Sequence, residues 1–139
     1  MTRAYYSILQ YQPSLGRMEC VNFGVVLWLP WLFTWRIAID ETYSNVARVA
    51  AAWEPGVTMG SLREEIACEA QALVKDIGER LKGEMGTLPP DRWLRSIKKR
   101  LRERYSCRVA MTDPRPCTIE SGEAMLEATV RDYLNDLVL

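Results

Sequence analysis

The stretch Val21 to Trp35, VNFGVVLWLPWLFTW, most constrains how this chain can fold, because its fifteen residues include three tryptophans and no charge. Extended to Ile39 it reaches nineteen residues, close to the length that spans a bilayer. Pro30 lies at its centre, however, and Arg36 lies within its far end. The runs on either side of Pro30 have strand length and are rich in β-branched and aromatic residues. We therefore predict a β-hairpin in place of a membrane segment, with the proline ending one strand.

The residues from Phe33 to Ile39 alternate between two faces with a period of two, which is typical of a strand with one buried face. The odd positions share the apolar face: Phe33, Trp35, Ile37 and Ile39. The even positions, Thr34, Arg36 and Ala38, share the other face. This period of two predicts a half-buried second strand of the hairpin.

The tip of the predicted hairpin is unusual, because hairpin connections are normally polar and rich in glycine, whereas this one has the sequence LPWL. A helix that covers the tip would give it a purely structural role. An exposed tip would instead anchor a partner, since aromatic residues dominate protein interfaces. The residues that would then bind the partner are Trp31, Leu32 and Phe33.

The rest of the chain alternates between helical and strand patterns. The expected elements are a strand at 4–13, helices at 41–53, 61–83 and 90–105, a strand at 106–112, a turn at 113–116 and a helix at 122–139. This order is α+β and not a strict βαβ alternation. We therefore predict an antiparallel sheet of about four strands packed against three to four helices. No linker divides the chain, so residues 1–139 are expected to form a single domain.

The residue types present exclude several classes of site. Histidine is absent, which removes the usual general base at neutral pH, Ser-His and Cys-His nucleophile pairs, and most catalytic zinc sites. The four cysteines have no C-x-x-C spacing: Cys20, Cys68, Cys107 and Cys117. We expect them to be reduced and mostly buried in a cytoplasmic protein. The N-terminal residues lack the order of a signal peptide, and no spacing indicates a cofactor or a metal.

Two short motifs carry a family resemblance. The first is an Arg-x-Glu-x-Val-Asn-x-Gly-Val-Val-Leu run after a tyrosine-rich strand: Arg17, Glu19, Val21, Asn22, Gly24, Val25, Val26 and Leu27. The second is MTDPRP, which contains Asp113 and Arg115, followed by an acidic helix. Together they resemble the bacterial family catalogued as domain of unknown function 3037. The resemblance brings no activity, but genes of that family often lie beside genes for HipA-like kinases, which implies a protein partner of that kind. The family usually has a polar turn where this chain has LPWLF.

The first motif has a structural and a functional interpretation. Asn22 in an apolar strand needs hydrogen-bond partners for its amide, and Gly24 within a strand indicates a bulge or a close backbone approach. Arg17 and Glu19 share a face if their segment is extended. The motif is then either a buried polar contact that holds the first two strands together or a polar patch that binds a ligand at the sheet edge.

A basic helix is the second candidate site. Residues 85–112 hold eight Lys or Arg against two Asp or Glu, although the whole chain has no net charge. One stripe of the expected helix holds Arg92, Arg95, Lys99 and Arg102, and Lys98 lies beside this stripe. Leu94, Ile97 and Leu101 form its apolar stripe. Such a helix either binds nucleic-acid phosphates or presents an ordinary solvated face.

Scattered carboxylates give a third and weaker hypothesis. Glu19, Asp40, Glu41 and Glu54 could form a divalent-metal site of a hydrolase or nuclease, but no spacing brings them together.

The function that we predict is a non-enzymatic module that binds a protein partner, or another copy of itself, through the hydrophobic hairpin. The alternative is a nucleic-acid-binding accessory protein that uses the basic helix.

Overall fold

The computed structural model describes residues 2–13, 20–30, 34–54, 56–81, 90–102, 108–120 and 125–139. These residues form five strands and four helices, which confirms the predicted α+β class. In chain order they are β1 (Thr2–Tyr11), β2 (Val21–Leu29), β3 (Thr34–Ile39), α1 (Ser44–Trp53), α2 (Met59–Leu81), α3 (Pro90–Arg102), β4 (Val109–Met111), β5 (Arg115–Ile119) and α4 (Leu126–Leu137). The two runs on either side of Pro30 are β2 and β3, as the hairpin prediction requires.

The strands form one antiparallel sheet around β1, in the order β3, β2, β1 and β4. β5 also pairs with β1, so β4 and β5 share the far side of that strand. The C-terminal half of β1 pairs with β4 from Leu9 to Tyr11, and its N-terminal half pairs with β5 from Thr2 to Tyr6. The sheet therefore ends with β3 on one side and with β4 and β5 on the other.

The predicted turn at 113–116 is wrong, because β5 begins at Arg115. Pro116 is part of this strand and lies opposite Tyr5. Proline has no N–H to donate to a ladder, so a sequence that contains it does not indicate a strand. An edge strand tolerates it, since alternate N–H groups there point away from the sheet. Position 116 is such a place.

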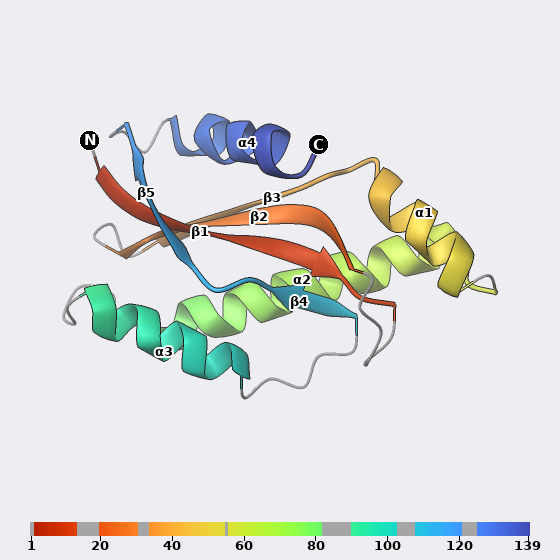
Figure 1. Ribbon diagram of the computed structural model, residues 1–139, viewed down its shortest axis with the longest axis horizontal. Helices are drawn as coiled ribbons and strands as arrows, with labels where there is room; N and C mark the ends of the chain where they lie inside the picture. The colour runs from red at the N-terminus through yellow and green to blue at the C-terminus, as the bar shows by residue number, and fades with distance from the viewer. Residues whose placement is uncertain are drawn as a thin grey trace.

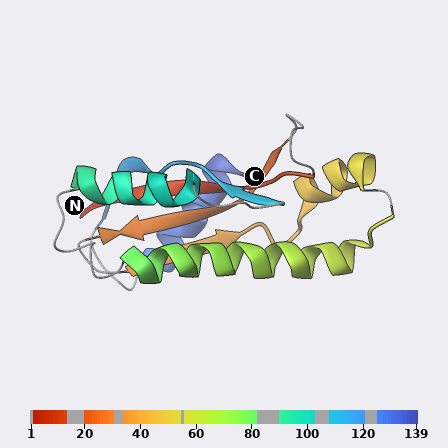
Figure 2. The same cartoon turned by 90° about the horizontal axis from the view of Figure 1, so that it is seen from below.

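Helices cover both faces of the sheet (Figures 1 and 2), and β1, β2 and β3 each have apolar residues on both faces. α2 and α3 pack against one face, around the fully buried Trp28 and Trp93. α4 packs against the other face and buries Leu126, Val130 and Leu134 there. α1 lies at one end of the sheet in Figure 1. The molecule thus has three layers, with β3 along one side of the central layer.

Two details of the helices and cysteines differ from expectation. The buried anchor of α3 is Trp93 together with Ile97, whereas Leu94 is only partly buried. Cys20 and Cys68 are exposed and Cys117 is half-buried, so the prediction of mostly buried cysteines is wrong for the first two. All three are free thiols.

Among the described residues, no helix is both long enough and apolar enough to cross a membrane.

Candidate interface at the edge of the sheet

β3 is an edge strand, since it pairs with β2 and no other strand of the described residues runs along its outer side. The amide of Asp40, directly after β3, donates a hydrogen bond of 2.8 Å to the carbonyl of Phe23. Main-chain groups alternate in direction along an antiparallel strand, so the even-numbered residues of β3 face β2. The odd-numbered residues Trp35, Ile37 and Ile39 therefore direct their N–H and C=O groups away from the sheet.

The carbonyl of Trp35 supports this assignment. It accepts a hydrogen bond of 2.9 Å from Nη1 of Arg36, a side chain of its own strand. The same nitrogen donates to Oγ1 of Thr34 over 2.7 Å. On the opposite face of the sheet, Nε of Arg36 lies 3.2 Å from a carboxylate oxygen of Glu127 in α4. The one charge of β3 is thus neutralised without contact with the face that carries Trp35.

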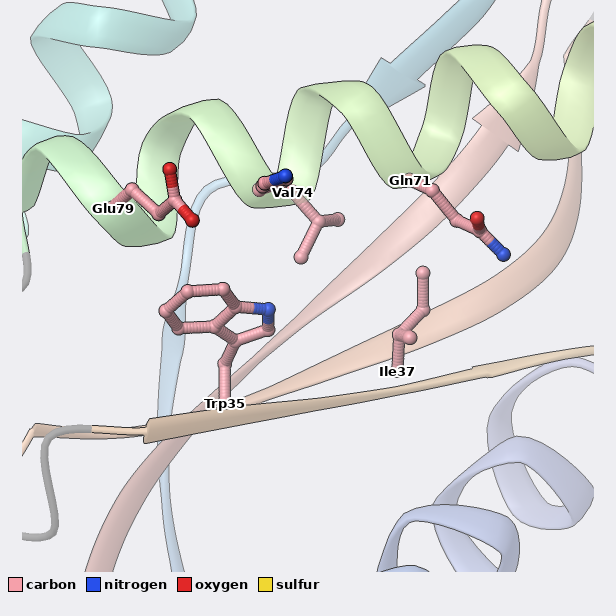
Figure 3. Close-up of a pocket in the computed structure, with 6 residues that line it drawn as sticks. Trp35, Ile37, Gln71, Val74 and Glu79 are labelled. Carbon is pink, nitrogen blue, oxygen red and sulfur yellow. The ribbon is translucent and has the colours of Figure 1, made fainter.

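An apolar pocket of about 290 Å³ opens between β3 and α2. Trp35 and Ile37 rise from the strand toward the helix, and side chains of α2 meet them from the other side (Figure 3). The residues of α2 that line the pocket are Gln71, Val74, Lys75 and Glu79. The pocket therefore adjoins the outward-facing main chain of β3, with an apolar floor and one charge of each sign from α2.

The position of Trp35 depends on a glycine of α2. A β-carbon placed at Gly78 would lie 2.6 Å from two atoms of the indole ring, so only glycine lets the helix approach this closely. Glycine within a helix costs about 1 kcal/mol relative to alanine. The close approach of Trp35 offsets this cost with buried apolar contact, and it fixes one wall of the pocket.

The opposite side of the sheet is much less open to another strand. β4 has only three residues, and Pro116 lies in β5. The carbonyl of Ile8 accepts a hydrogen bond from Thr112, so the even residues of β1 face this side. Tyr5 faces β2, and Pro116 opposite it must direct its main chain outward, where it offers no N–H. Proline and short strands are the usual devices that block edge pairing.

Several residues of the predicted sites lie outside the described residues. They are Trp31, Leu32 and Phe33 of the hairpin tip, Arg17 and Glu19 of the first motif, and the side chain of Arg102. The structure therefore leaves the role of the tip as a prediction. The adjoining β3 and its pocket are the part of the hairpin whose geometry is described.

The described part of the first motif makes a structural contact between strands. The side-chain carbonyl of Asn22 accepts a hydrogen bond of 3.1 Å from Nε2 of Gln10 on β1. The register of β1 and β2 shifts at this point, so that one residue of β2 is left over in a bulge next to Gly24. A β-carbon at Gly24 would lie 3.0 Å from the carbonyl oxygen of Ala38 on β3. Both the bulge and the close backbone approach indicated by this glycine are present.

The second motif lies apart from the pocket. Asp113 and Arg115 are both exposed, and Arg115 begins β5 on the far side of β1 from β3. The structure does not bring them together with Asn22 and Gly24, which lie on β2. The two motifs of the family resemblance therefore do not form one site in the described residues.

The basic stripe of α3 faces away from the core. Arg92, Arg95 and Lys99 are exposed and Lys98 is half-buried, while Trp93 and Ile97 point inward. None of these four cations has an ion pair with a residue that the structure describes. Arg100 differs from them, since its Nη2 lies 3.0 Å from a carboxylate oxygen of Asp76 in α2. The predicted stripe therefore exists as a surface, on the helix that flanks α2.

Glu19 of the metal hypothesis lies outside the described residues, and its other carboxylates, Asp40, Glu41 and Glu54, do not form a metal site. Oδ1 of the buried Asp40 accepts hydrogen bonds from the amide and hydroxyl of Thr42, at 3.0 and 2.7 Å. Glu54 instead accepts the hydroxyl of Tyr11 and pairs with Arg108 at 2.7 Å. Burial raises the pKa of the Tyr11 hydroxyl above its ordinary value, and the hydrogen bond to Glu54 raises it further. Within the described ranges, no group of three or more metal-binding side chains is close enough to hold an ion.

Sequence reasoning did not find the α2 side of the pocket. Gln71, Val74 and Lys75 carry no motif, and their proximity to β3 depends on how the helix docks. Gly78 was the one available signal, because a single glycine within a helical pattern often has a packing reason. It could indicate a close contact, but not that the contact is with Trp35.

No family model, no curated protein and no solved structure matches this chain. The geometry of the β3 edge is therefore the observation from which a function can be derived. At this edge the outward-facing main-chain groups lie beside an apolar pocket, and the opposite edge of the sheet is blocked.

Proposed function

We propose that this chain is a non-enzymatic binding module of a bacterial cytoplasmic system, which contacts another polypeptide chain by adding a strand to the outer edge of β3. The observation that carries the proposal is the outward direction of the main chain at Trp35, Ile37 and Ile39 beside an apolar pocket. Edge strands are ready templates for such pairing, and many recognition domains use them.

The outward-facing main chain of β3 and the adjoining pocket would contribute differently to binding. Main-chain hydrogen bonds to the edge give affinity for any extended segment, while the pocket selects side chains at alternate positions. An apolar side chain of the incoming strand would cover Ile37 and Val74, which gains about 25 cal/mol for each Å² removed from water. Lys75 and Glu79 at the pocket can each pair with an opposite charge and so set the direction of the strand.

The partner class follows from the family resemblance and is itself a proposal. If the chain is a relative of the domain of unknown function 3037 family, a HipA-like kinase is the protein partner to test first. The free thiols at Cys20, Cys68 and Cys117 are compatible with a reducing cytoplasm. Neither consideration bears on the geometry of the edge, which would accept a strand of any chain.

The experiment compares two substitutions at one outward-facing position. Ile37→Pro removes the outward N–H while leaving the ladder to β2 intact, and Ile37→Val keeps that N–H on a β-branched side chain. Tagged wild type and both variants are purified from the native host, and amide hydrogen exchange is measured with and without the companion. We expect Ile37→Pro alone to lose the companion, and the companion to slow exchange at Trp35, Ile37 and Ile39. Unchanged recovery with Ile37→Pro, or unprotected edge amides in the complex, would refute the proposal.

Nucleic-acid binding is a second candidate, supported by the exposed cations of α3 that lack described ion pairs. These cations would neutralise nucleic-acid phosphates and release the counterions condensed on them, so the affinity should fall steeply as the salt concentration rises. Reversing Arg95, Lys98 and Lys99 to glutamate is expected to abolish binding to labelled RNA and DNA while circular dichroism stays unchanged. Reversal of Arg48 on α1 is the control for a general loss of positive charge. Retained binding after the α3 reversal would eliminate this candidate.

A further inference from the structure

We propose that the chain which occupies the β3 edge is a second copy of this protein, paired antiparallel about a two-fold axis at Ile37. The two sheets would then form one continuous sheet across the dimer. This inference rests on the proposed function, because it names the occupant of the same edge. Two-fold dimers are the commonest closed assemblies, and such an interface must be complementary to itself.

The main chain of β3 satisfies that requirement in one register. The outward-facing residues are Trp35, Ile37 and Ile39, a set of three whose middle member is Ile37. Centred there, Ile37 lies opposite its own symmetry mate, and Trp35 lies opposite Ile39 of the second copy. All three are then hydrogen-bonded pairs, so that every outward N–H and C=O of the strand has a partner. The carbonyl of Trp35 can keep Arg36 as well, because it has two lone pairs.

The side chains favour the same register. On the face toward α2, Trp35 pairs with an isoleucine across the axis, and aromatic with β-branched residues are favourable cross-strand neighbours. On the other face, Arg36 lies opposite Ala38, and Glu127 already neutralises it. A register centred on Arg36 would set this charge directly opposite its own mate, which is destabilising. A register centred on Ala38 would leave Trp35 opposite residues beyond β3.

The pocket and the far edge fit a closed pair. The second copy's Ile37 would lie beside Ile37 at the mouth of the pocket, where apolar surface is otherwise open. The other side of the sheet ends in the short β4 and in Pro116 of β5. No third copy is therefore expected to add to the dimer, since it has no second open edge of this kind among the described strands.

The first test measures the mass of the purified full-length protein by sedimentation over a wide concentration range. We expect the wild type and Ile37→Val to form a dimer, and Ile37→Pro to raise the dimer dissociation constant by about tenfold or more, because two symmetry-related hydrogen bonds are lost. Circular dichroism checks that Ile37→Pro is folded. A monomeric wild type at all concentrations overturns the inference. If its edge amides are still protected by a different companion, only the occupant is wrong; if they are never protected, the proposed function fails too.

The second test reads the register and does not depend on the proline variant. Ile37→Cys places two sulfurs across the axis, at a Cα separation of about 5.5 Å that a disulfide can bridge. Ile39→Cys is the matched control on the same face, because residue 39 lies about 13 Å from its own mate in this register. After mild oxidation, peptide mass spectrometry identifies the linked cysteines and separates them from the native thiols. A 37–37 link without a 39–39 link supports the inference, and a dimer with any other linkage overturns it.

Discussion

Gly78 of α2 and Trp35 of β3 are in such close contact that a β-carbon on the glycine would lie 2.6 Å from the indole ring. The helix can therefore approach the edge strand only because residue 78 has no side chain. This contact sets the wall of the pocket beside the free edge, and it couples the packing of α2 to the binding surface that we propose.

Gly78→Ala is expected to destabilise the protein. The gain of about 1 kcal/mol in helix propensity is smaller than the cost of overpacking, which is typically about 1–3 kcal/mol. Gly60→Ala in the same helix is the control, since a β-carbon there meets no atom within 4 Å. Urea unfolding should show a lower midpoint for Gly78→Ala and an equal or higher one for Gly60→Ala. An unchanged or higher midpoint for Gly78→Ala would contradict the prediction, because displacing Trp35 would then cost no more than the gain in helix propensity.

The pair of Arg108 and Glu54 is expected to stabilise the junction of β4 with α1. Oε1 of Glu54 lies 2.7 Å from Arg108, its other oxygen accepts the Tyr11 hydroxyl, and its side chain is only 13% exposed. Arg108→Met leaves this half-buried carboxylate without its cation, at a cost of about 1.5–3 kcal/mol. Arg108→Met combined with Glu54→Gln should cost less than the sum of the two single changes. Additive effects in chemical unfolding would show that the pair contributes nothing.

Asp76 is expected to make the free energy of unfolding fall more steeply as the pH is lowered. Partial burial alone raises the pKa of its carboxyl, but the hydrogen bond and charge of Arg100, with Arg80 added, hold that pKa below its ordinary value of 3.8. A lowered folded pKa means that the stabilisation is present above the ordinary value and is lost as pH falls through the folded one. Asp76→Asn should reduce stability at pH 7 by less than about 1 kcal/mol and flatten the loss below pH 4. Asp132→Asn on α4 is the control. An equal loss of unfolding free energy below pH 4 in the wild type and in Asp76→Asn would contradict the prediction.

The loss of stability at alkaline pH is expected to depend on Tyr133. This residue stacks on Tyr6 with ring centroids 5.7 Å apart. Burial, followed by contact with Cys117, raises the pKa of the Tyr133 hydroxyl to about 12. A raised folded pKa gives stability that is complete below the ordinary value of 10 and is lost as pH rises toward 12. Tyr133→Phe should therefore make unfolding less dependent on pH between 10 and 12. The same dependence in both proteins, measured by urea unfolding, would rule out this residue as the cause.

Local patterns predicted most elements because they depend on short-range periodicity. The alternation from Thr34 to Ile39 gave the two faces of β3 correctly, since a strand pleat fixes side-chain direction without reference to the rest of the chain. The turn assigned to 113–116 failed for the complementary reason. Pro116 is compatible with a strand only at an edge, and the position of a strand in the sheet is not a local property.

The candidate site shows the same division. Sequence patterns were enough to predict the class of fold, the hairpin on either side of Pro30, the basic stripe of α3 and a bulge or close approach at Gly24. Tertiary structure alone decided that β3 is the open edge, that Pro116 blocks the other one, and that α2 docks on Trp35 through Gly78. Propensity and periodicity act over a few residues, whereas strand order and helix docking follow from burying all apolar faces at once. The surface formed by β3 and α2 therefore depends on the packing of the whole chain and cannot be predicted from either segment alone.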